Sequence, residues 1–320
     1  MIGIVAIGRN EGERLIRCLD SLPRDGSIIV YVDSGSTDGS IAAAQARGAQ
    51  VVALDMTQPF TAARARNAGL AALQEAGLTD GYVQFIDGDC ALDPAWLPTA
   101  SAFLNANPRV AVACGRRRER FPEASIYNQL CDYEWDTPIG EAQHCGGDAL
   151  MRLEPVLAAG GYDATLVAGE EPELCSRLRQ AGWKIWRLDA PMTLHDAAIL
   201  RFGQWWMRSV RSGFGYTQVW DVTRGRANRA HGHEVGRTAV WGGAIPLAIL
   251  AAALASPLAL AAFALYPVQV ARIAARQGFS RSGWLRATFT MLAKFPELQG
   301  MARYARRRLS GGANTAILYK

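Results

Sequence analysis

The sequence YVQFIDGD at residues 82–89 decides the predicted fold, because a mostly apolar run passes directly into two aspartates. Residues 82–86 have the length and character of a buried strand. Asp87 and Asp89 follow, separated by one glycine. Hard oxygen ligands at this spacing bind divalent cations and leave positions open for diphosphate oxygens. We therefore predict a ligand site at the end of a central strand.

The chain around this segment alternates short apolar runs with helical patterns, which is typical of βαβ units and a parallel sheet. Predicted strands cover residues 2–7, 27–32, 50–54, 82–86 and 110–114. Predicted helices cover residues 11–22, 62–76 and 170–181, and another begins near Thr37-Asp38, either of which would cap it. The pattern predicts an α/β fold with a mostly parallel, Rossmann-like sheet flanked by helices.

Polar residues follow three of these strands: Gly8-Arg9-Asn10, Asp33-Ser34-Gly35-Ser36 and Asp87-Gly88-Asp89. In an open parallel sheet the carboxyl ends lie side by side, where such folds bind their ligands. Ordinary βα turns are also rich in Asp, Ser and Gly. Three such turns on one sheet edge favour a nucleotide site.

Charge divides the 320-residue chain into two predicted domains, residues 1–197 and 198–320. The first carries 17 Lys/Arg against 26 acidic residues, a net charge of −9, and the second 17 against three, a net charge of +14. Half of the residues are hydrophobic, which excludes a disordered or fibrous chain. A basic, apolar region suits an anionic membrane surface or a phosphate-bearing acceptor. Because no nucleic-acid-binding module is recognisable, we do not expect a nucleic-acid partner.

An uncharged segment of 34 residues, 238–271, predicts membrane association. As one straight helix it would be about 50 Å long, beyond the roughly 30 Å hydrocarbon core. Pro246, Ser256-Pro257 and Pro267 interrupt it, and arginines flank both ends. Positive residues favour the cytoplasmic side, so we predict a hairpin of two short helices broken near Ser256-Pro257. One tilted span and a buried helical pair are the alternatives.

Residues 199–220 contain six aromatic residues of the Phe, Trp and Tyr types, three arginines and no acidic residue. This composition is typical of a helix in a membrane interface. A tryptophan-rich core helix has a similar composition, so both interpretations stay open here. The six scattered cysteines, without C-x-x-C spacing, predict buried, reduced thiols in a cytosolic protein.

Three further segments carry candidate chemistry. Arg64 and Arg66 lie on an Ala-rich helix, and arginine forks suit phosphate or a base edge, although a solvated face is equally expected. Glu170 and Glu171 begin a helix, where acids are favoured electrostatically, and a carboxylate is also the base that transfer to a hydroxyl needs. His195 is a candidate metal ligand near the end of the acidic half.

Five motifs in order resemble the family 2 inverting glycosyltransferases over roughly residues 1–196. They are the polar turn at Asn10-Glu11 after the first strand, VDSGSTDGS at 32–40, ARARNAGL at 63–70, FIDGD at 85–89, and GEEPEL at 169–174 followed by Arg177-Leu178 and Ala181-Gly182-Trp183. The resemblance implies a GT-A fold, a nucleotide-diphosphate sugar donor, Mg²⁺ or Mn²⁺, and single displacement with inversion at the anomeric carbon.

The resemblance also implies site residues. Glu171 would be the catalytic base, and Asp89, with Asp87 and His195, would hold the metal. The donor site would be lined by Asn10, Glu11, Asp33, Arg64, Arg66, Asn67, Asp87 and Glu170. Three positions depart from the family pattern: Ile7 replaces a proline, Ser34 a second aspartate, and Glu171 an aspartate.

With the basic C-terminal region, these features predict a membrane-bound enzyme at the cytoplasmic face of the bacterial inner membrane, using a lipid-linked saccharide acceptor in polysaccharide or glycolipid assembly. The alternatives are a sugar-1-phosphate nucleotidyltransferase, whose Gly-rich loop fits residues 8–12 poorly, and a non-catalytic nucleotide-sugar-binding scaffold. The sequence does not define the oligomeric state.

Overall fold

The computed structural model describes residues 1–24, 26–227 and 229–311. These form an N-terminal unit, residues 1–200 with 225–230, and a C-terminal unit, residues 201–224 with 231–311. The predicted functional division at residue 197 stays a prediction. Within the predicted region 198–320, residues 228 and 312–320 lie outside the described residues.

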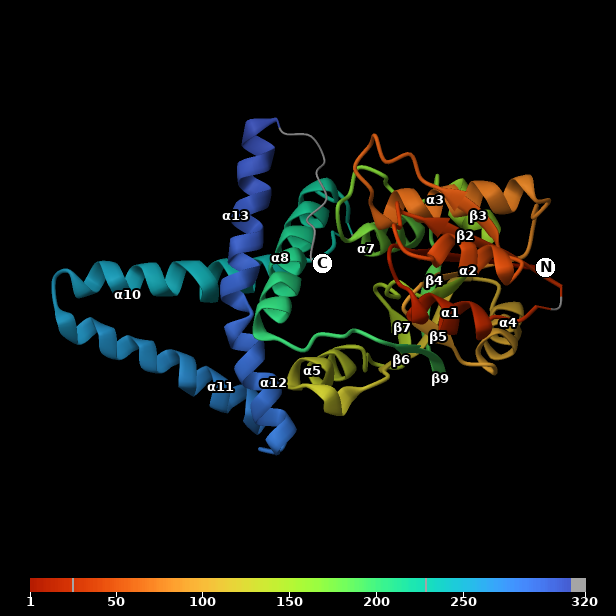
Figure 1. The fold of residues 1–320 in the computed structure, drawn as a ribbon. Coiled ribbons are helices and arrows are strands. Elements are labelled where there is room, and N and C mark those ends of the chain that lie inside the picture. The colour runs from red at the N-terminus through yellow and green to blue at the C-terminus, as the bar shows by residue number, and fades with distance from the viewer. Residues whose placement is uncertain (25, 228, 312–320) are drawn as a thin grey trace. The chain divides into compact units, whose positions relative to one another are not determined.

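The N-terminal unit is built on one sheet of nine strands in the described chain, with the order β3-β2-β1-β4-β8-β6-β9-β5 and with β7 beside β9 (Figure 1). The strands are β1 (Ile2–Gly8), β2 (Ser27–Asp33), β3 (Gln50–Ala53), β4 (Tyr82–Asp87), β5 (Cys90–Leu92), β6 (Val110–Glu119), β7 (Gly140–Ala142), β8 (Ala149–Arg152) and β9 (Lys184–His195). β1, β2, β3 and β4 are mutually parallel, and β8 pairs antiparallel with both β4 and β6. β6 and β9 are also parallel, but β5 and β7 pair antiparallel with β9, so the whole sheet is mixed and not mostly parallel as predicted. The α/β class, with a central sheet flanked by helices, is confirmed.

Strand register places the predicted polar turns at one edge of the sheet. On one side of β1, Gly8 pairs with Asp33, and on the other side Ile7 pairs with Asp87. Each of these residues ends or nearly ends its strand. The three carboxyl ends therefore lie side by side, as the sequence predicts.

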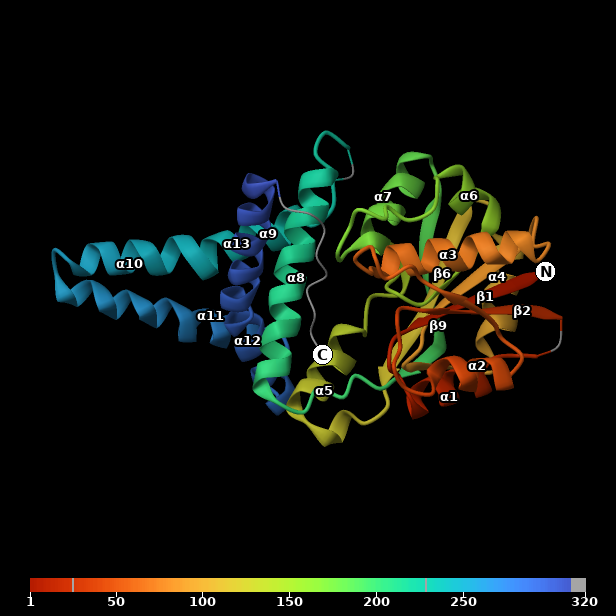
Figure 2. The same ribbon diagram turned by 45° about the horizontal axis from the view of Figure 1, so that its top comes forward.

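Helices cover both faces of the sheet: Figure 2 shows α3 on one face and α1 and α2 on the other. The helices of this unit are α1 (Glu13–Asp20), α2 (Ser40–Ala46), α3 (Ala62–Glu75), α4 (Trp96–Ala106), α5 (Ile126–Glu134), α6 (Leu153–Ala158) and α7 (Glu170–Gln180), with a 3-10 turn at Pro122–Ala124. A Cβ atom at Gly69 would overlap the side chain of Val5, so this glycine allows α3 to pack closely on β1.

The structure differs from the sequence prediction mainly after residue 114. The strand predicted at 110–114 continues to Glu119, and β5, β7, β8 and β9 have no predicted counterpart. Helix α2 begins after Gly39, and Asp38 accepts a hydrogen bond from the backbone N–H of Ser40 at 2.9 Å. Asp38 therefore supports the start of α2 from one residue before its N-cap.

The C-terminal unit is helical. Its helices are α8 (Phe202–Val222), α9 (Gly232–Thr238), α10 (Ile245–Ala253), α11 (Leu265–Ala275), α12 (Arg281–Leu292) and α13 (Lys294–Ser310), with a π-helical segment at Ala239–Ala244 and a 3-10 helix at Pro257–Ala264. α8 packs on α13 through glycines: a Cβ at Gly213 would overlap the carbonyl oxygen of Glu297, and one at Gly300 would overlap that of Val210. Trp205 and Phe214 are buried. This face of α8 matches the core-helix interpretation of the sequence.

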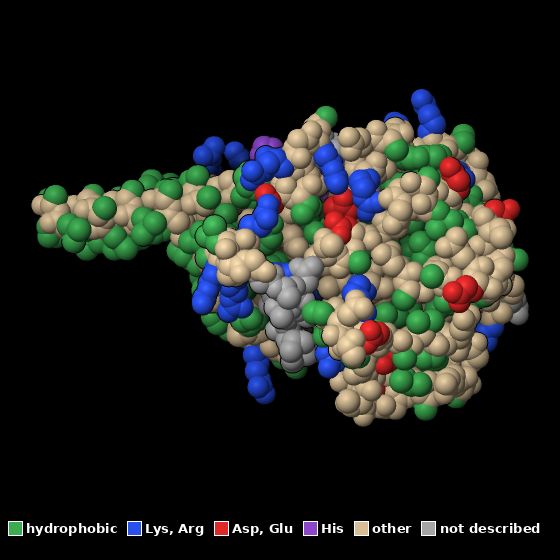
Figure 3. Space-filling model, turned by 90° about the horizontal axis from the view of Figure 1, so that it is seen from above, with side chains coloured by type: hydrophobic (Ala, Val, Ile, Leu, Met, Phe, Trp, Pro, Cys, Tyr) green, Lys and Arg blue, Asp and Glu red, His purple; other side chains and the backbone are tan. Residues whose placement is uncertain are grey.

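The apolar segment forms the predicted hairpin, with its break at Ser256, where the backbone is extended (φ −150°) before Pro257. The 3-10 helix Pro257–Ala264 packs beside α10, and α11 continues from it, as both ribbon views show (Figures 1 and 2). Two helical stretches, Gly232–Ala253 with a mean hydropathy of 1.4 and Pro257–Ala275 with 1.6, are long and apolar enough to cross a membrane. In their most apolar windows only 28% and 6% of the residues are buried, which argues against a buried helical pair. Hydrophobic side chains cover the hairpin surface seen in Figure 3.

Candidate functional site

Asp87 lies at the end of β4 between two guanidinium groups. Arg66 of α3 donates to its Oδ1 at 2.9 Å, and Arg117 of β6 contacts its Oδ2 at 3.3 Å. Burial opposes ionisation of this carboxyl, but the two arginines outweigh burial and hold the pKa of Asp87 below its usual value. Asp87 is therefore a fixed anion whose oxygens are already oriented.

Arg66 joins two segments that the sequence places about 80 residues apart. Its side chain is 3% exposed, and besides Asp87 it pairs with the carboxylate of Glu170 at the start of α7. Burial disfavours the charged guanidinium, yet Asp87 and Glu170 raise the pKa of Arg66 above its usual value. The structure thus brings three predicted site residues into one buried ion network.

A second network behind Asp87 was not predicted from the sequence. Asp148, which is fully buried, accepts the backbone N–H of Asp87 at 3.0 Å and pairs with Arg117 at 2.7 Å. The hydroxyl of Thr193 donates at 2.8 Å to Oδ2 of Asp148, the oxygen that also pairs with Arg117. A Cβ on Gly147 would lie 2.8 Å from Asp87 Oδ2, so this glycine leaves room beside the carboxylate.

Asp89 faces His195 at the end of β9. His195 Nε2 lies 3.3 Å from Asp89 Oδ1, and the backbone N–H of Asp196 donates to the carbonyl of Asp89 at 3.0 Å. The histidine ring also packs edge-on against Trp135, with 4.7 Å between ring centroids. The predicted pairing of Asp89 and His195 is thus present in the geometry, and both residues are partly exposed.

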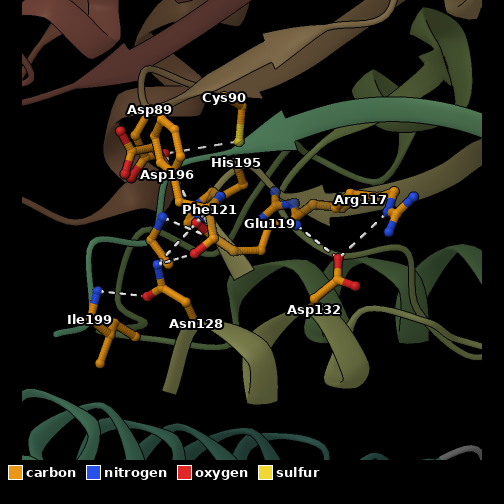
Figure 4. A network of polar contacts seen from close by, with 12 residues as sticks. Asp89, Cys90, Arg117, Glu119, Phe121, Asn128, Asp132, His195, Asp196 and Ile199 are labelled. Carbon is orange, nitrogen blue, oxygen red and sulfur yellow. Dashed lines mark hydrogen bonds and ion pairs between the residues drawn. The ribbon is translucent and has the colours of Figure 1, made fainter. Parts of the chain in front are cut away.

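Glu119 lies behind His195, as Figure 4 shows. Its side chain is fully buried, and its Oε2 lies 3.8 Å from His195 Nδ1. Three donors hold the carboxylate: the backbone N–H groups of Phe121 and Ala197, both at 3.1 Å, and the Asn128 side chain at 3.2 Å. The 3.8 Å separation is longer than a hydrogen bond, so Glu119 places a carboxylate close behind the histidine ring without bonding to it.

Glu171 begins α7 next to Glu170, and its carboxylate is turned toward the segment 145–148. Its Oε1 accepts the backbone N–H of Cys145 at 2.5 Å and the thiol of Cys175 at 3.2 Å. Gly147 in the same segment accepts from Arg66 at 3.4 Å. Segment 145–148 therefore contacts both the Asp87 network and Glu171.

The loops after β1 and β2 are tied to each other. Asn10, in a left-handed conformation (φ 53°), accepts the backbone N–H of Thr37 at 2.7 Å and donates its own backbone N–H to Ser36 at 2.9 Å. Asp33 is 1% exposed and accepts the backbone N–H groups of Gly35 and Ser36. The carboxylate of Asp33 shapes its own loop, so any contact with a nucleoside is additional to this structural role.

The remaining predicted donor-site residues make local contacts. Arg64 donates to the backbone carbonyls of Asp55, Gln58 and Pro59, and it holds the loop before α3. Asn67 makes two hydrogen bonds to the backbone of Tyr162, and Glu11 pairs with Arg14 at 2.6 Å. The structure thus brings Arg66, but not Arg64 or Asn67, into contact with the acidic residues.

Three residues of the site were missed by sequence reasoning: Arg117, Glu119 and Asp148. The first two lie in the charged run RRRER at 116–120, and Asp148 follows a Gly-Gly pair. A run of charged residues at the end of an apolar strand can indicate a functional site. The run does not show which of its side chains point toward the site and which point into solvent.

Comparison with known proteins agrees with this geometry. Residues 4–151 match the family model described as Glycosyl transferase family 2. The succinoglycan biosynthesis protein ExoA of Rhizobium meliloti is 27% identical over 173 residues, which are 50% of this chain and 51% of ExoA. The match therefore spans about half the length of this curated relative.

Solved structures show the same fold. The mannosyltransferase PcManGT from Pyrobaculum calidifontis, in complex with GDP-Man and Mn²⁺, is 19% identical with a TM-score of 0.65, covering 94% of this chain and 86% of that one. S. aureus TarS 1–349 is 12% identical with a TM-score of 0.51, covering 97% and 92%. Residues 4–151 therefore carry the match to glycosyltransferase family 2, and the fold is of the GT-A type. The resemblance seen in the sequence is confirmed.

Proposed function

We propose that this glycosyltransferase moves a sugar from a nucleotide-diphosphate donor to an acceptor hydroxyl, with inversion at the anomeric carbon. The observation that carries the proposal is the buried Arg66, which contacts Asp87 of the DGD turn and Glu170 next to the candidate base. This contact brings distant acidic segments to one sheet edge. The GDP-Man and Mn²⁺ bound in the PcManGT complex also support a nucleotide-sugar donor for this chain.

Asp89 and His195, with Asp87, are the residues that would hold Mg²⁺ or Mn²⁺. Ligands on adjacent positions of an octahedral ion with bonds near 2.1 Å lie roughly 3 Å apart, and Asp89 Oδ1 lies 3.3 Å from His195 Nε2. His195 Nδ1 is buried without a hydrogen-bond partner among the described residues, and Glu119 lies behind it. A divalent cation at this site supplies Lewis-acid stabilisation of the charge on the diphosphate leaving group.

Glu171 is the proposed catalytic base. It accepts the proton of the acceptor hydroxyl as the oxygen attacks the anomeric carbon from the face opposite the diphosphate. Both hydrogen bonds from Cys145 and Cys175 engage Oε1, and an ionised carboxylate has acceptor positions on both oxygens. The two contacts orient the carboxylate, whose side chain is one methylene longer than the aspartate of the family pattern.

The acceptor is proposed to be a lipid-linked saccharide at the cytoplasmic face of the bacterial inner membrane. Two features support it: the exposed apolar hairpin and the net positive charge of residues 198–320. A 22-residue helix is about 33 Å long, enough to cross a roughly 30 Å hydrocarbon core. The polysaccharide role in the name of ExoA points to the same kind of pathway.

A screen of nucleotide sugars tests the proposed function. Purified full-length protein is incubated with each donor, Mn²⁺ or Mg²⁺, and a bacterial lipid extract, and release of nucleoside diphosphate is measured. We expect release with one donor class, dependent on the metal and stimulated by the extract. Release of pyrophosphate from a nucleoside triphosphate and a sugar-1-phosphate would instead support a nucleotidyltransferase.

A further inference from the structure

Two cysteines and Glu171 form a compact cluster at the start of α7. Cys145 Sγ and Cys175 Sγ are 3.8 Å apart, and Cys175 Sγ is 3.2 Å from Glu171 Oε1. The ligand atoms of the three residues all lie within 4.8 Å of one another. The Cys175 thiol orients Glu171 through this hydrogen bond, but the Cys145 thiol has no role in the proposed transfer reaction, which leaves the pairing of the two sulfurs unexplained.

The spacing of the three atoms fits a tetrahedral zinc ion. With Zn–S bonds of about 2.3 Å and a Zn–O bond of about 2.1 Å, tetrahedral angles place the two sulfurs about 3.8 Å apart and a sulfur and the oxygen about 3.5 Å apart. The observed separations of 3.8 and 3.2 Å are close to these values. The cluster therefore needs little rearrangement to close around such an ion.

The backbone prepares the cluster for this geometry. Cys175 follows Glu171 by one helical turn, so both side chains lie on the same face of α7. The backbone N–H of Cys145 donates to Glu171 Oε1 and fixes the loop against the helix. Glu171 and Cys175 are buried, whereas Cys145 is partly exposed and gives a route of entry.

Ligand chemistry separates this cluster from the Asp89 site. Two thiolates and one carboxylate suit Zn²⁺, whereas Mg²⁺ and Mn²⁺ prefer oxygen ligands such as the carboxylate of Asp89. We propose that Cys145, Cys175 and Glu171 bind Zn²⁺ as a second metal site, with water in the fourth position. Binding displaces the two thiol protons into solvent, and the ion takes the place of the Cys175 S–H proton beside Glu171 Oε1.

Oxidation to a disulfide is the competing chemistry for such a pair. Peroxide attack requires a thiolate. The hydrogen bond with Cys145 lowers the pKa of Cys175, but burial and the neighbouring Glu171 together outweigh it and raise the pKa to about 11. A thiophilic cation displaces the thiol proton as it binds, so it does not depend on a free thiolate.

Zinc at this position would inhibit transfer, a consequence that rests on the proposed role of Glu171. A carboxylate bound to Zn²⁺ no longer accepts the proton of the acceptor hydroxyl. Zinc binding itself does not depend on that role, so the two claims are measured separately.

The test is titration of metal-free, reduced, full-length protein with Zn²⁺ against a chromogenic zinc chelator. We expect one tight site in the wild type. Because outer-shell changes alone cost about 10–100-fold in metal affinity, Cys145→Ser and Cys175→Ser should each weaken it by at least about 100-fold. Co²⁺ in the same site should give the thiolate-to-metal charge-transfer absorption, which both variants should lose.

Cys131→Ser, in α5, is the matched control and should bind Zn²⁺ as the wild type does. Asp89→Ala should also keep the zinc site while losing Mn²⁺. Wild-type affinity in both cysteine variants, or loss of free thiols to a Cys145–Cys175 disulfide with no zinc binding after reduction, would overturn the proposal. Tight zinc binding with undiminished transfer would leave the site standing and would count against Glu171 as the base.

Discussion

Asp87 and Asp89 are two residues apart in sequence but have different surroundings. Asp87 is held by Arg66 and Arg117 on one sheet edge, while Asp89 faces His195. A carboxylate already paired with two guanidinium groups is a weaker metal ligand than one beside an imidazole ring, which is itself a metal ligand. We therefore expect Asp89 to be the principal protein ligand of the metal and Asp87 to orient the site.

Asp89→Asn should reduce Mn²⁺ affinity by more than tenfold, because the variant removes the anionic oxygen while keeping the side-chain shape. Isothermal titration calorimetry with Mn²⁺, with and without donor, measures it. Asp80→Asn, at an exposed loop position, is the control and should bind as the wild type does. Equal Mn²⁺ affinity in Asp89→Asn and the wild type would remove Asp89 from the metal site.

Glu119→Gln should destabilise the N-terminal unit by about 1–3 kcal/mol, because an amide cannot accept at both oxygens and leaves a buried donor unpaired. The affected donors are the N–H groups of Phe121 and Ala197 and the Asn128 amide. Denaturant unfolding gives the free energy. Glu123→Gln, which is exposed, should unfold as the wild type does. An equally small effect of Glu119→Gln would contradict a structural role for the three hydrogen bonds to Glu119.

At the scale of elements, the spacing of apolar residues and the composition of the turns predict the sheet up to its fourth strand. The run at 82–89 identified the strand end, and register confirmed that Asp33 and Asp87 flank the end of β1. Beyond residue 114 the strands are antiparallel or irregular: the pairing of β6 with β9 shifts register three times. Hydrophobic alternation in the sequence does not reveal such bulges, so the strand pattern alone did not place His195 beside Asp89; only the family resemblance did.

The sequence also does not show which groups a charged side chain will contact, and this limited the prediction of the site. Arg64 and Arg66 lie two positions apart on α3, and a helix directs such side chains to different faces. Arg66 turns inward to Asp87, whereas Arg64 binds loop carbonyls. Likewise, nothing in a single sequence indicates that Asp148 receives the N–H of Asp87, because that contact depends on β8 pairing with β4.

Close packing of α8 on α13 gives a prediction at this scale. Gly300→Ala should destabilise the C-terminal unit by about 1–3 kcal/mol, because the new methyl group would overlap the Val210 carbonyl and force the helices apart. Thermal unfolding in detergent measures it. Gly236→Ala, in α9 with nothing within 4 Å of its Cβ, is the control and should stabilise by about 0.5–1 kcal/mol. Similar melting temperatures for the two variants would contradict the packing.

For the whole molecule, charge and hydropathy predicted two regions of different character. Residues 1–197 fold around the sheet that carries the acids, and residues 201–224 and 231–311 form a separate helical unit. The hairpin break at Ser256-Pro257 was predictable because proline ends helices. The α8–α13 contact was not, because it depends on two glycines about 90 residues apart in sequence.

Membrane binding by the hairpin is the prediction that belongs to the whole chain. Leu247→Glu with Val268→Glu places two charges on exposed positions of α10 and α11. Each charge should cost about 2–3 kcal/mol if it is buried in the bilayer. The double variant should therefore no longer float with anionic liposomes in a flotation assay. Leu309→Glu, exposed on α13, is the control and should still float with them. Flotation of the double variant would contradict insertion of the hairpin.

The most direct measurement compares transfer and donor binding in Glu171→Gln. The variant keeps the shape of the side chain but removes its basicity, so we predict a loss of transfer of about 10²–10⁴-fold with donor affinity within a few-fold of the wild type. Glu154→Gln, at an exposed position of α6, is the matched control. Near-normal turnover in Glu171→Gln would contradict the claim that the carboxylate beside the Arg66 network takes the acceptor proton.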